Sequence, residues 1–236
     1  MTEKEALLRN INAILQEKGL RSINSLGDAS QGEIEITGVK EYLEHNQRFY
    51  TDVVFRVLFP NNQEGLFPVR FNANSAKSDG AVMVPIINGL FILVRQWRVT
   101  LGRYTFELPR GFSEKLDQAQ IQSQFGTIKI GDLPLGTLAR ELGEEVMATG
   151  QIISVTHLGN VAENTGTHNV LPSVFLVAIE AEPAKLRERL DQEIQSIAFK
   201  TATEVTAAIG QELCDLHTLG ALMLATRHLR SLPQLG

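Results

Sequence analysis

The spacing of apolar positions predicts a chain that mixes helices and strands. Near the N-terminus, one helix is predicted from Leu7, Leu8, Ile11, Ile14 and Leu15, which recur at helical spacing, with Gly19 as its end. Two strands are predicted at 52–59 and 66–71, on either side of turn-forming residues. The polar segment 72–79 indicates a linker, which places a domain boundary near residue 78. With only two predicted strands, residues 1–78 are too strand-poor for an independent core.

The clearest local signal is a β-hairpin. Apolar runs at 81–87 and 90–94 flank Asn88-Gly89, a pair typical of tight hairpin turns. Further strands are predicted at 104–108, 152–158 and 171–180, and helices at 135–148, 203–209 and 216–229, with Gly150 and Gly210 as stops and Asp215 as an N-cap. This order has no regular βαβ rhythm, so it predicts an α+β fold with a mixed sheet.

Composition narrows the class of protein. With 236 residues, 43% of them hydrophobic, the chain can bury a substantial core. A net charge of -5 gives no support to a nucleic-acid partner. The single cysteine, Cys214, cannot form an internal disulfide and is expected to be a small buried hydrophobe. The apolar stretch 81–94 is too short and too interrupted to span a membrane, and the acidic N-terminus is unlike a signal peptide. A cytoplasmic protein is therefore expected.

The segment 134–150 predicts an amphipathic helix with an acidic side. Its apolar stripe, expected to be buried, comprises Leu135, Leu138, Ala139, Leu142 and Val146. Glu141 and Glu145 stand one turn apart on another face, with Glu144 beside them. These carboxylates form either a solvated face, relieved by Arg140, or a site for Mg²⁺, which prefers oxygen ligands. Upstream, the turn at Gly111 allows close backbone approach, and its carbonyl could ligate a metal.

A resemblance to a known family favours the metal site. Residues 140–145, Arg-Glu-Leu-Gly-Glu-Glu, match the R-E-U-x-E-E core of the Nudix signature G-x5-E-x7-R-E-U-x-E-E-x-G-U, in which U is aliphatic. Further segments recur in the same order and at similar spacing in one branch of this family: residues 79–82, the hairpin, Gln96-Trp97-Arg98, 106–111 and 209–222. The chain therefore resembles Nudix hydrolases, in particular the ADP-ribose and nucleotide-sugar pyrophosphatases, over residues 79–225.

The resemblance implies a fold and a domain division. The expected fold is an α/β/α sandwich around a mixed sheet, with a Nudix hydrolase domain at 79–236. The small N-terminal helix-and-strand region, 1–78, is expected to form the interface of a homodimer, because related pyrophosphatases use a similar segment in this way.

The resemblance also implies Mg²⁺-dependent hydrolysis of the diphosphate bond of a nucleoside diphosphate derivative, with ADP-ribose or a nucleotide sugar as substrate and Mn²⁺ as a substitute metal. The implied metal ligands are Glu141, Glu144, Glu145 and the carbonyl of Gly111. The implied catalytic residues are Glu144, Glu145, Arg140, which orients the glutamates, and Glu163 as general base, with His168 as the alternative. The implied substrate-binding residues are Arg98, Gln96 and Glu107.

Several of these residues also have structural interpretations. Arg98 could be a surface arginine at a strand end, and Glu107 a cross-strand partner of an arginine. Trp97 could stack on a base or pack in the core. A different function also stays open: a catalytically weak Nudix-fold regulator that binds ADP-ribose or another nucleotide.

The signature box departs from the family pattern in three ways. Gly111 and Arg140 are 29 residues apart where the signature has about 14, which implies an insertion of 15 residues. The leading glutamate is replaced by Asp117 or Asp132, depending on the register. Met147 stands where the signature has its glycine, so the helix is expected to run on toward Gly150. The polar insertion, 113–130, is expected to be a lid or substrate-selecting wall, or else a passive surface excursion.

Overall fold

The chain forms two compact units. The computed structural model describes residues 1–46, 50–72, 80–98, 101–111, 142, 151–182, 186 and 194–231. Unit 1 comprises Met1–Asp79 with Glu163–Val170, and unit 2 comprises Gly80–Ala162 with Leu171–Gly236. Residues 163–170, which lie inside the predicted hydrolase domain in sequence, are thus part of the N-terminal unit.

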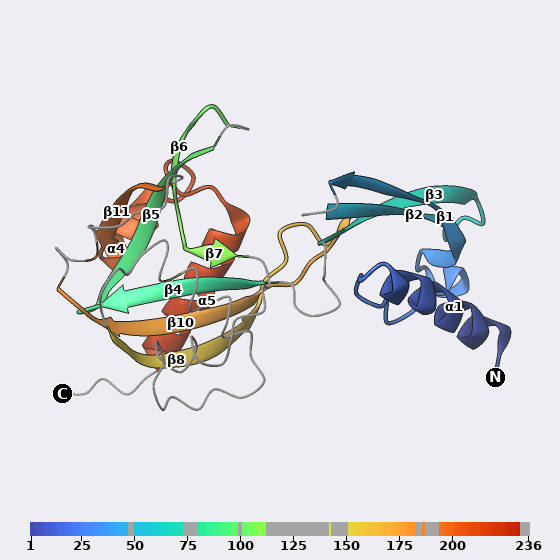
Figure 1. Cartoon of the computed structure of the whole chain (residues 1–236), viewed down its shortest axis with the longest axis horizontal. Helices are drawn as coiled ribbons and strands as arrows, with labels where there is room; N and C mark the ends of the chain where they lie inside the picture. The colour runs from blue at the N-terminus through green and yellow to red at the C-terminus, as the bar shows by residue number, and fades with distance from the viewer. Residues whose placement is uncertain are drawn as a thin grey trace. The chain divides into compact units, whose positions relative to one another are not determined.

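Unit 1 consists of a helix packed against a small sheet (Figure 1). Its elements are α1 (Glu3–Glu17), the 3-10 helix η1 (Ala29–Gln31), β1 (Glu35–Asn46), β2 (Tyr50–Leu58), β3 (Glu64–Asn72) and β9 (His168–Asn169). The sheet order is β1-β2-β3-β9, with β9 parallel to β3 and the other pairs antiparallel. Thr2 and Glu5 form a capping box at the start of α1, which satisfies N–H groups that the helix itself cannot bond. The predicted helix and both predicted strands are confirmed.

Unit 1 has its own hydrophobic core. Alternate residues of β2 point toward α1, so that Val53, Phe55 and Val57 pack with Ile11 and Leu15. The expectation that this region is too strand-poor was wrong, because the sequence pattern missed β1. That strand contains a glycine and irregular register against β2, so its apolar residues do not alternate strictly along the sequence.

Unit 2 is built on a mixed sheet. Its strands are β4 (Ala81–Ile87), β5 (Leu90–Arg98), β6 (Arg103–Glu107), β7 (Arg110–Gly111), β8 (Gln151–Asn160), β10 (Ser173–Glu180) and β11 (Ile194–Lys200). The main order is β11-β5-β4-β10-β8, in which only β4 and β10 are parallel, while β6 pairs with β5 and β7 with β4. The predicted hairpin is confirmed: Asn88 and Gly89 both have positive φ, 49° and 77°, which a two-residue turn of this kind requires.

The two faces of this sheet bury different sets of side chains. One face packs against α4 (Ala202–Ala208) and α5 (Leu216–Ser231), which lies behind the sheet in Figure 1. The opposite face contributes Ile92, Val94 and other alternate residues to a second cluster that includes Leu142. Leu142 is helical and 1% exposed, so a helical residue covers this face as well. The predicted α+β class, with a mixed sheet between helical layers, is confirmed.

Most element boundaries in unit 2 fall close to the sequence expectations. The predicted strands 104–108, 152–158 and 171–180 and the predicted helices 203–209 and 216–229 are all present, whereas β11 was missed. Of the predicted helix 135–148, only Leu142 is described, and it is buried as its apolar stripe predicted. The insertion, Asp117, Asp132, Met147 and Gly150 lie outside the described residues. In the described ranges, no helix has the length and apolar character needed to cross a bilayer.

The core of unit 1 predicts a position-specific effect of truncation in α1. Leu15→Ala should lower the free energy of unfolding by about 2–5 kcal/mol, because Leu15 is fully buried and its removal leaves a cavity. Ile14→Ala, one position earlier and 36% exposed, is the matched control and should cost about 1 kcal/mol or less. Urea unfolding of both full-length variants measures the difference. Equal losses would contradict this packing of α1.

Candidate functional site

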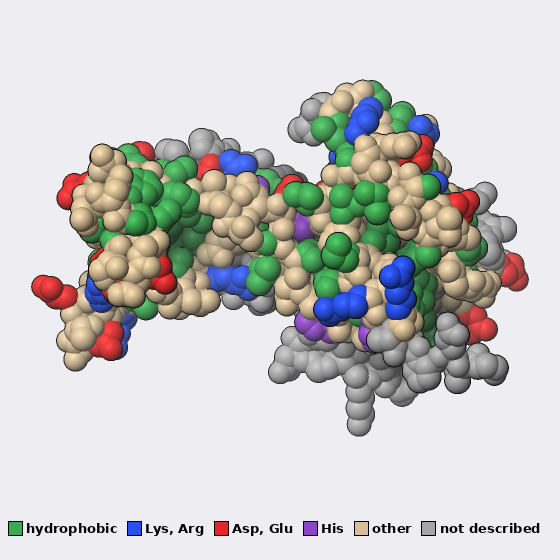
Figure 2. Space-filling model, turned by 180° about the vertical axis from the view of Figure 1, so that it is seen from behind, with side chains coloured by type: hydrophobic (Ala, Val, Ile, Leu, Met, Phe, Trp, Pro, Cys, Tyr) green, Lys and Arg blue, Asp and Glu red, His purple; other side chains and the backbone are tan. Residues whose placement is uncertain are grey.

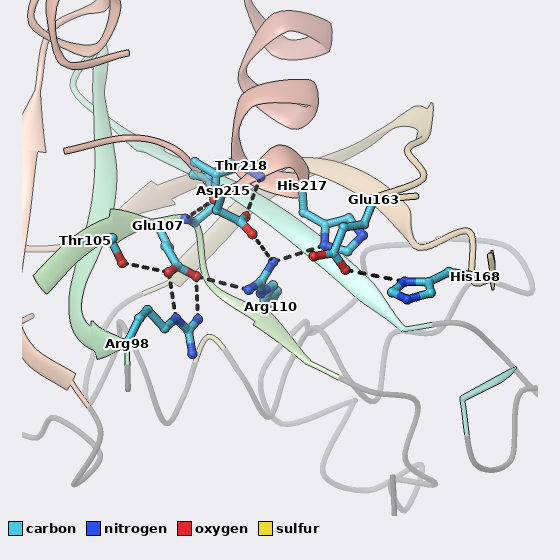
Figure 3. A network of polar contacts seen from close by, with 10 residues as sticks. Arg98, Thr105, Glu107, Arg110, Glu163, His168, Asp215, His217 and Thr218 are labelled. Atoms are coloured by element: carbon cyan, nitrogen blue, oxygen red, sulfur yellow. Dashed lines mark hydrogen bonds and ion pairs between the residues drawn. The ribbon is translucent and has the colours of Figure 1, made fainter. Parts of the chain in front are cut away.

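A buried carboxylate is the centre of the polar network in unit 2. Glu107, in β6, is 2% exposed. Its Oε1 accepts hydrogen bonds from Thr105 Oγ1 at 2.8 Å and from Arg98 Nε at 2.6 Å, and its Oε2 accepts from Arg98 Nη2 and, at 3.1 Å, from Arg110 Nη2 (Figure 3). Two guanidinium groups and a hydroxyl therefore compensate one desolvated charge.

The strand pairing places this network on the sheet face that Leu142 covers. Glu107 lies directly opposite Val94 in the β5–β6 pair, and opposite residues share a face. Gln96 and Arg98 follow Val94 at alternate positions of β5, so they share that face too. Gln96 is 6% exposed, whereas the Arg98 side chain is 30% exposed and reaches solvent. The three predicted substrate-binding residues are thus brought to one side of the sheet.

Arg110 joins Glu107 to the start of α5. Besides its bond to Glu107, it donates through Nη1 to Asp215 Oδ1 at 2.8 Å and contacts His217 Nδ1 at 3.0 Å. A guanidinium only donates, so a hydrogen bond in this contact requires the lone pair of His217 Nδ1.

Asp215 also caps α5. Its Oδ2 accepts a hydrogen bond of 2.8 Å from the backbone N–H of Thr218, as the sequence predicted for an N-cap. Thr218 Oγ1 in turn accepts from the backbone N–H of Leu108 at 3.1 Å, which ties the helix to the turn after β6. Burial would raise the pKa of Asp215 and is the largest single influence, but the charge of Arg110 and hydrogen bonds from Thr218 and Arg110 hold that pKa below its usual value.

The other face of the β5–β6 hairpin is aromatic and basic. Trp97 pairs edge-to-face with Tyr104 at 5.1 Å between ring centroids, and the Arg95 guanidinium lies 4.3 Å from the centre of the Tyr104 ring. In Figure 2 the hairpin stands at the top of unit 2, with basic and hydrophobic side chains side by side. Of the two alternatives for Trp97, core packing does not hold, because Trp97 is 50% exposed, and strand alternation directs it away from Arg98.

The remaining described candidates are Glu163, Gly111 and Cys214. Glu163 belongs to unit 1, where its Oε2 is 3.8 Å from His168 Nδ1. Gly111 is half-buried in β7, opposite Ala81 of β4. Cys214 is half-buried and lies 3.5 Å from Arg103 Nη2, so it is less enclosed than expected.

The predicted acidic metal ligands, Glu141, Glu144 and Glu145, lie outside the described residues, as does Arg140. In the part of the chain that the structure describes, no three His, Cys, Asp or Glu side chains are grouped as a metal site would require. Both oxygens of Glu107 are engaged by arginines, so this carboxylate serves as their counter-ion. The metal site and the catalytic residues therefore stay predictions.

Comparison with known proteins supports the fold. No family model matches the chain, and no curated protein matches it. A solved structure described as "Crystal structure of ADP compounds hydrolase" is similar, with a TM-score of 0.58 and 15% sequence identity. The similarity covers 88% of this chain and 97% of that one. At this level of identity, the likeness shows a shared fold.

Part of the network has no local signal in the sequence. No role was predicted for the Arg110 side chain, and Thr105 and Thr218 were not singled out. Asp215 was identified as a helix cap, without its ion pair. The cap was local and therefore visible in sequence, whereas the Arg110–Asp215 pair joins residues 105 positions apart.

The burial of Glu107 predicts a large effect of neutralisation. Glu107→Gln should lower the free energy of unfolding by about 2–3 kcal/mol, because it leaves two guanidinium groups without their shared counter-ion. Asp52→Asn is the matched control: Asp52 also binds an arginine, Arg70, through both oxygens, at 2.8 and 2.9 Å, but that arginine side chain is 41% exposed. Asp52→Asn should lower the free energy of unfolding by about 1 kcal/mol or less. Denaturant unfolding of both variants checks the order, and a larger loss in the Asp52 variant would refute it.

Proposed function

We propose that the chain is a Mg²⁺-dependent hydrolase of the Nudix type that cleaves the diphosphate bond of a nucleoside diphosphate derivative. ADP-ribose or a nucleotide sugar is the substrate that the resemblance favours, and the hydrolase of similar fold is described as acting on ADP compounds. The observation that carries the proposal is the Arg98–Glu107–Arg110 network, which lies on the sheet face covered by helical Leu142.

Arg98 supports binding of a diphosphate. Its guanidinium is held at one edge by Glu107, while 30% of its side chain remains exposed. A guanidinium fork suits phosphate oxygens, and a fixed counter-ion reduces the side-chain freedom that is lost on binding. Glu107 thus acts as an orienting group for Arg98 in this proposal, rather than as a direct ligand of the substrate.

The position of Leu142 supports the placement of the metal ligands. A helix that buries Leu142 is expected to carry Glu141 and Glu145 together on one flank, since they are one turn apart. Three carboxylates and a backbone carbonyl at Gly111 form a donor set that fits a hard divalent cation. Bound Mg²⁺, or Mn²⁺ in its place, would neutralise charge on the phosphoryl oxygens. Glu163, with His168 beside it, stays the proposed general base.

Loss of one proposed metal ligand tests the activity. Purified protein should hydrolyse at least one of ADP-ribose, ADP-glucose, UDP-glucose and dinucleotides with Mg²⁺ and not without it. Glu145→Gln should lower turnover roughly 100-fold or more, because it removes a ligand charge. Glu180→Gln is the control, since Glu180 is an exposed glutamate at the end of β10. A folded Glu145 variant with full activity would remove the metal assignment. Binding without hydrolysis in the unmodified protein would favour the regulatory alternative.

The proposed homodimer is tested separately. We propose that residues 1–78 form its interface, and the sheet of unit 1 exposes apolar side chains that could serve it: Leu66 is 53% and Tyr50 is 38% exposed. Light scattering at micromolar concentration should give twice the mass of the chain. Leu66→Glu should shift the mass toward the monomer, whereas Ile153→Glu, at a residue of unit 2 with 55% exposure, should not. A monomeric mass for the unmodified protein would contradict the proposal.

A further inference from the structure

Asp215 makes two kinds of contact that can be separated chemically. One oxygen caps α5 through the backbone N–H of Thr218, and the other accepts from Arg110. A cap needs only a hydrogen-bond acceptor, and asparagine supplies it about as well as aspartate. The ion pair with Arg110 needs the negative charge. A role of Asp215 beyond helix capping would therefore depend on its charge.

Arg110 connects the two faces of the sheet. Asp215 is at the start of α5, whose buried residues belong to the cluster on one face. Glu107 is on the opposite face, with Val94 and Leu142. Arg110 donates to both carboxylates, at 2.8 Å and 3.1 Å, and its neighbour Gly111 is paired to β4 of the same sheet.

The order of the contacts defines a linear chain of charges. Asp215 binds Arg110, Arg110 binds Glu107, and Glu107 binds Arg98. The two carboxylates and two guanidinium groups sum to zero charge, so each arginine has a compensating carboxylate. Arg98 and Arg110 already share Glu107, so without the charge of Asp215 this one carboxylate would have to compensate both guanidinium groups, and their orientation would be less determined.

We infer that Asp215 is a positioning residue of the phosphate-binding side of the sheet, which acts on Arg98 through Arg110 and Glu107 and holds the turn before Gly111. The phosphate-containing substrate in this inference rests on the proposed function, whereas the contacts of Asp215 do not depend on it. The backbone bond from Leu108 to Thr218 is a second attachment of the same turn to α5. The first turn of α5 thus sets the position of Arg110 and, through Glu107, of Arg98 on the opposite face of the sheet.

Asp215→Asn tests this inference, because it keeps the cap and removes the ion pair. With the best substrate found for the unmodified protein, kcat/KM should fall about tenfold or more, since small displacements of binding groups have large effects on rate. Backbone amide exchange in 104–111 should become about tenfold faster, because that turn loses an attachment. Thr201→Asn exchanges the cap residue of α4, whose side chain bonds to Glu204 of the same helix among the described residues, and should change neither quantity.

A double variant shows whether Asp215 acts through Arg110. Arg110→Lys keeps a charge but cannot reach both carboxylates, so it should resemble Asp215→Asn. The Asp215→Asn/Arg110→Lys protein should be no slower than the Lys variant alone, because both changes break one pathway. Multiplied losses in kcat/KM, or wild-type exchange in 104–111 of the Asp215 variant, would overturn the inference. If the unmodified protein hydrolyses no substrate, the proposed function fails, and the exchange experiment alone decides the role of Asp215.

Discussion

Burial of the Glu107 carboxylate is the constraint on which the organisation of unit 2 depends. A charge removed from water at 2% exposure must be matched by donors of fixed geometry. Arg98 supplies two of these donors from β5, Thr105 supplies one from β6 itself, and Arg110 supplies one from β7. A shift of the β5–β6 register by one residue would turn Glu107 to the other face, so the network and the register require each other.

Strand alternation gives one hairpin two chemically different faces. On one face of β5, Val94 packs in the core, and Gln96 and Arg98 follow it on the side of the polar network. Arg95 and Trp97 lie on the other face, with the aromatic ring of Tyr104. Helical Leu142 covers the face that carries the polar network. The opposite face of β5 packs on α4 and α5 through Phe91 and Leu93. Arg98 therefore stands at the rim of the core with 30% of its side chain exposed, while its counter-ion, Glu107, is shielded from water.

The two units are stabilised by independent cores. Unit 1 buries Phe55 and Phe71 in the core that α1 covers. Its sheet gains a fourth strand, β9, from the segment that comes directly after β8 of unit 2 in the chain. The loop that carries Glu163 and His168 is therefore anchored through backbone pairing with β3. Its position depends on the N-terminal unit, although its sequence lies far from that unit.

The sequence by itself determined the elements whose signals are local. The hairpin at Asn88-Gly89 depends on two adjacent residues with positive φ, and the cap of α5 depends on Asp215 and Thr218, three residues apart. Periodicity also predicted the burial of Leu142 and the mixed α+β class. Only the tertiary structure decided the long-range partners. Arg110 and Asp215 are 105 positions apart, the segment 163–170 joins unit 1, and Trp97 faces solvent. These outcomes depend on which strands become neighbours, and no spacing along a single chain encodes that choice, because pairing energies are set by the whole assembled core.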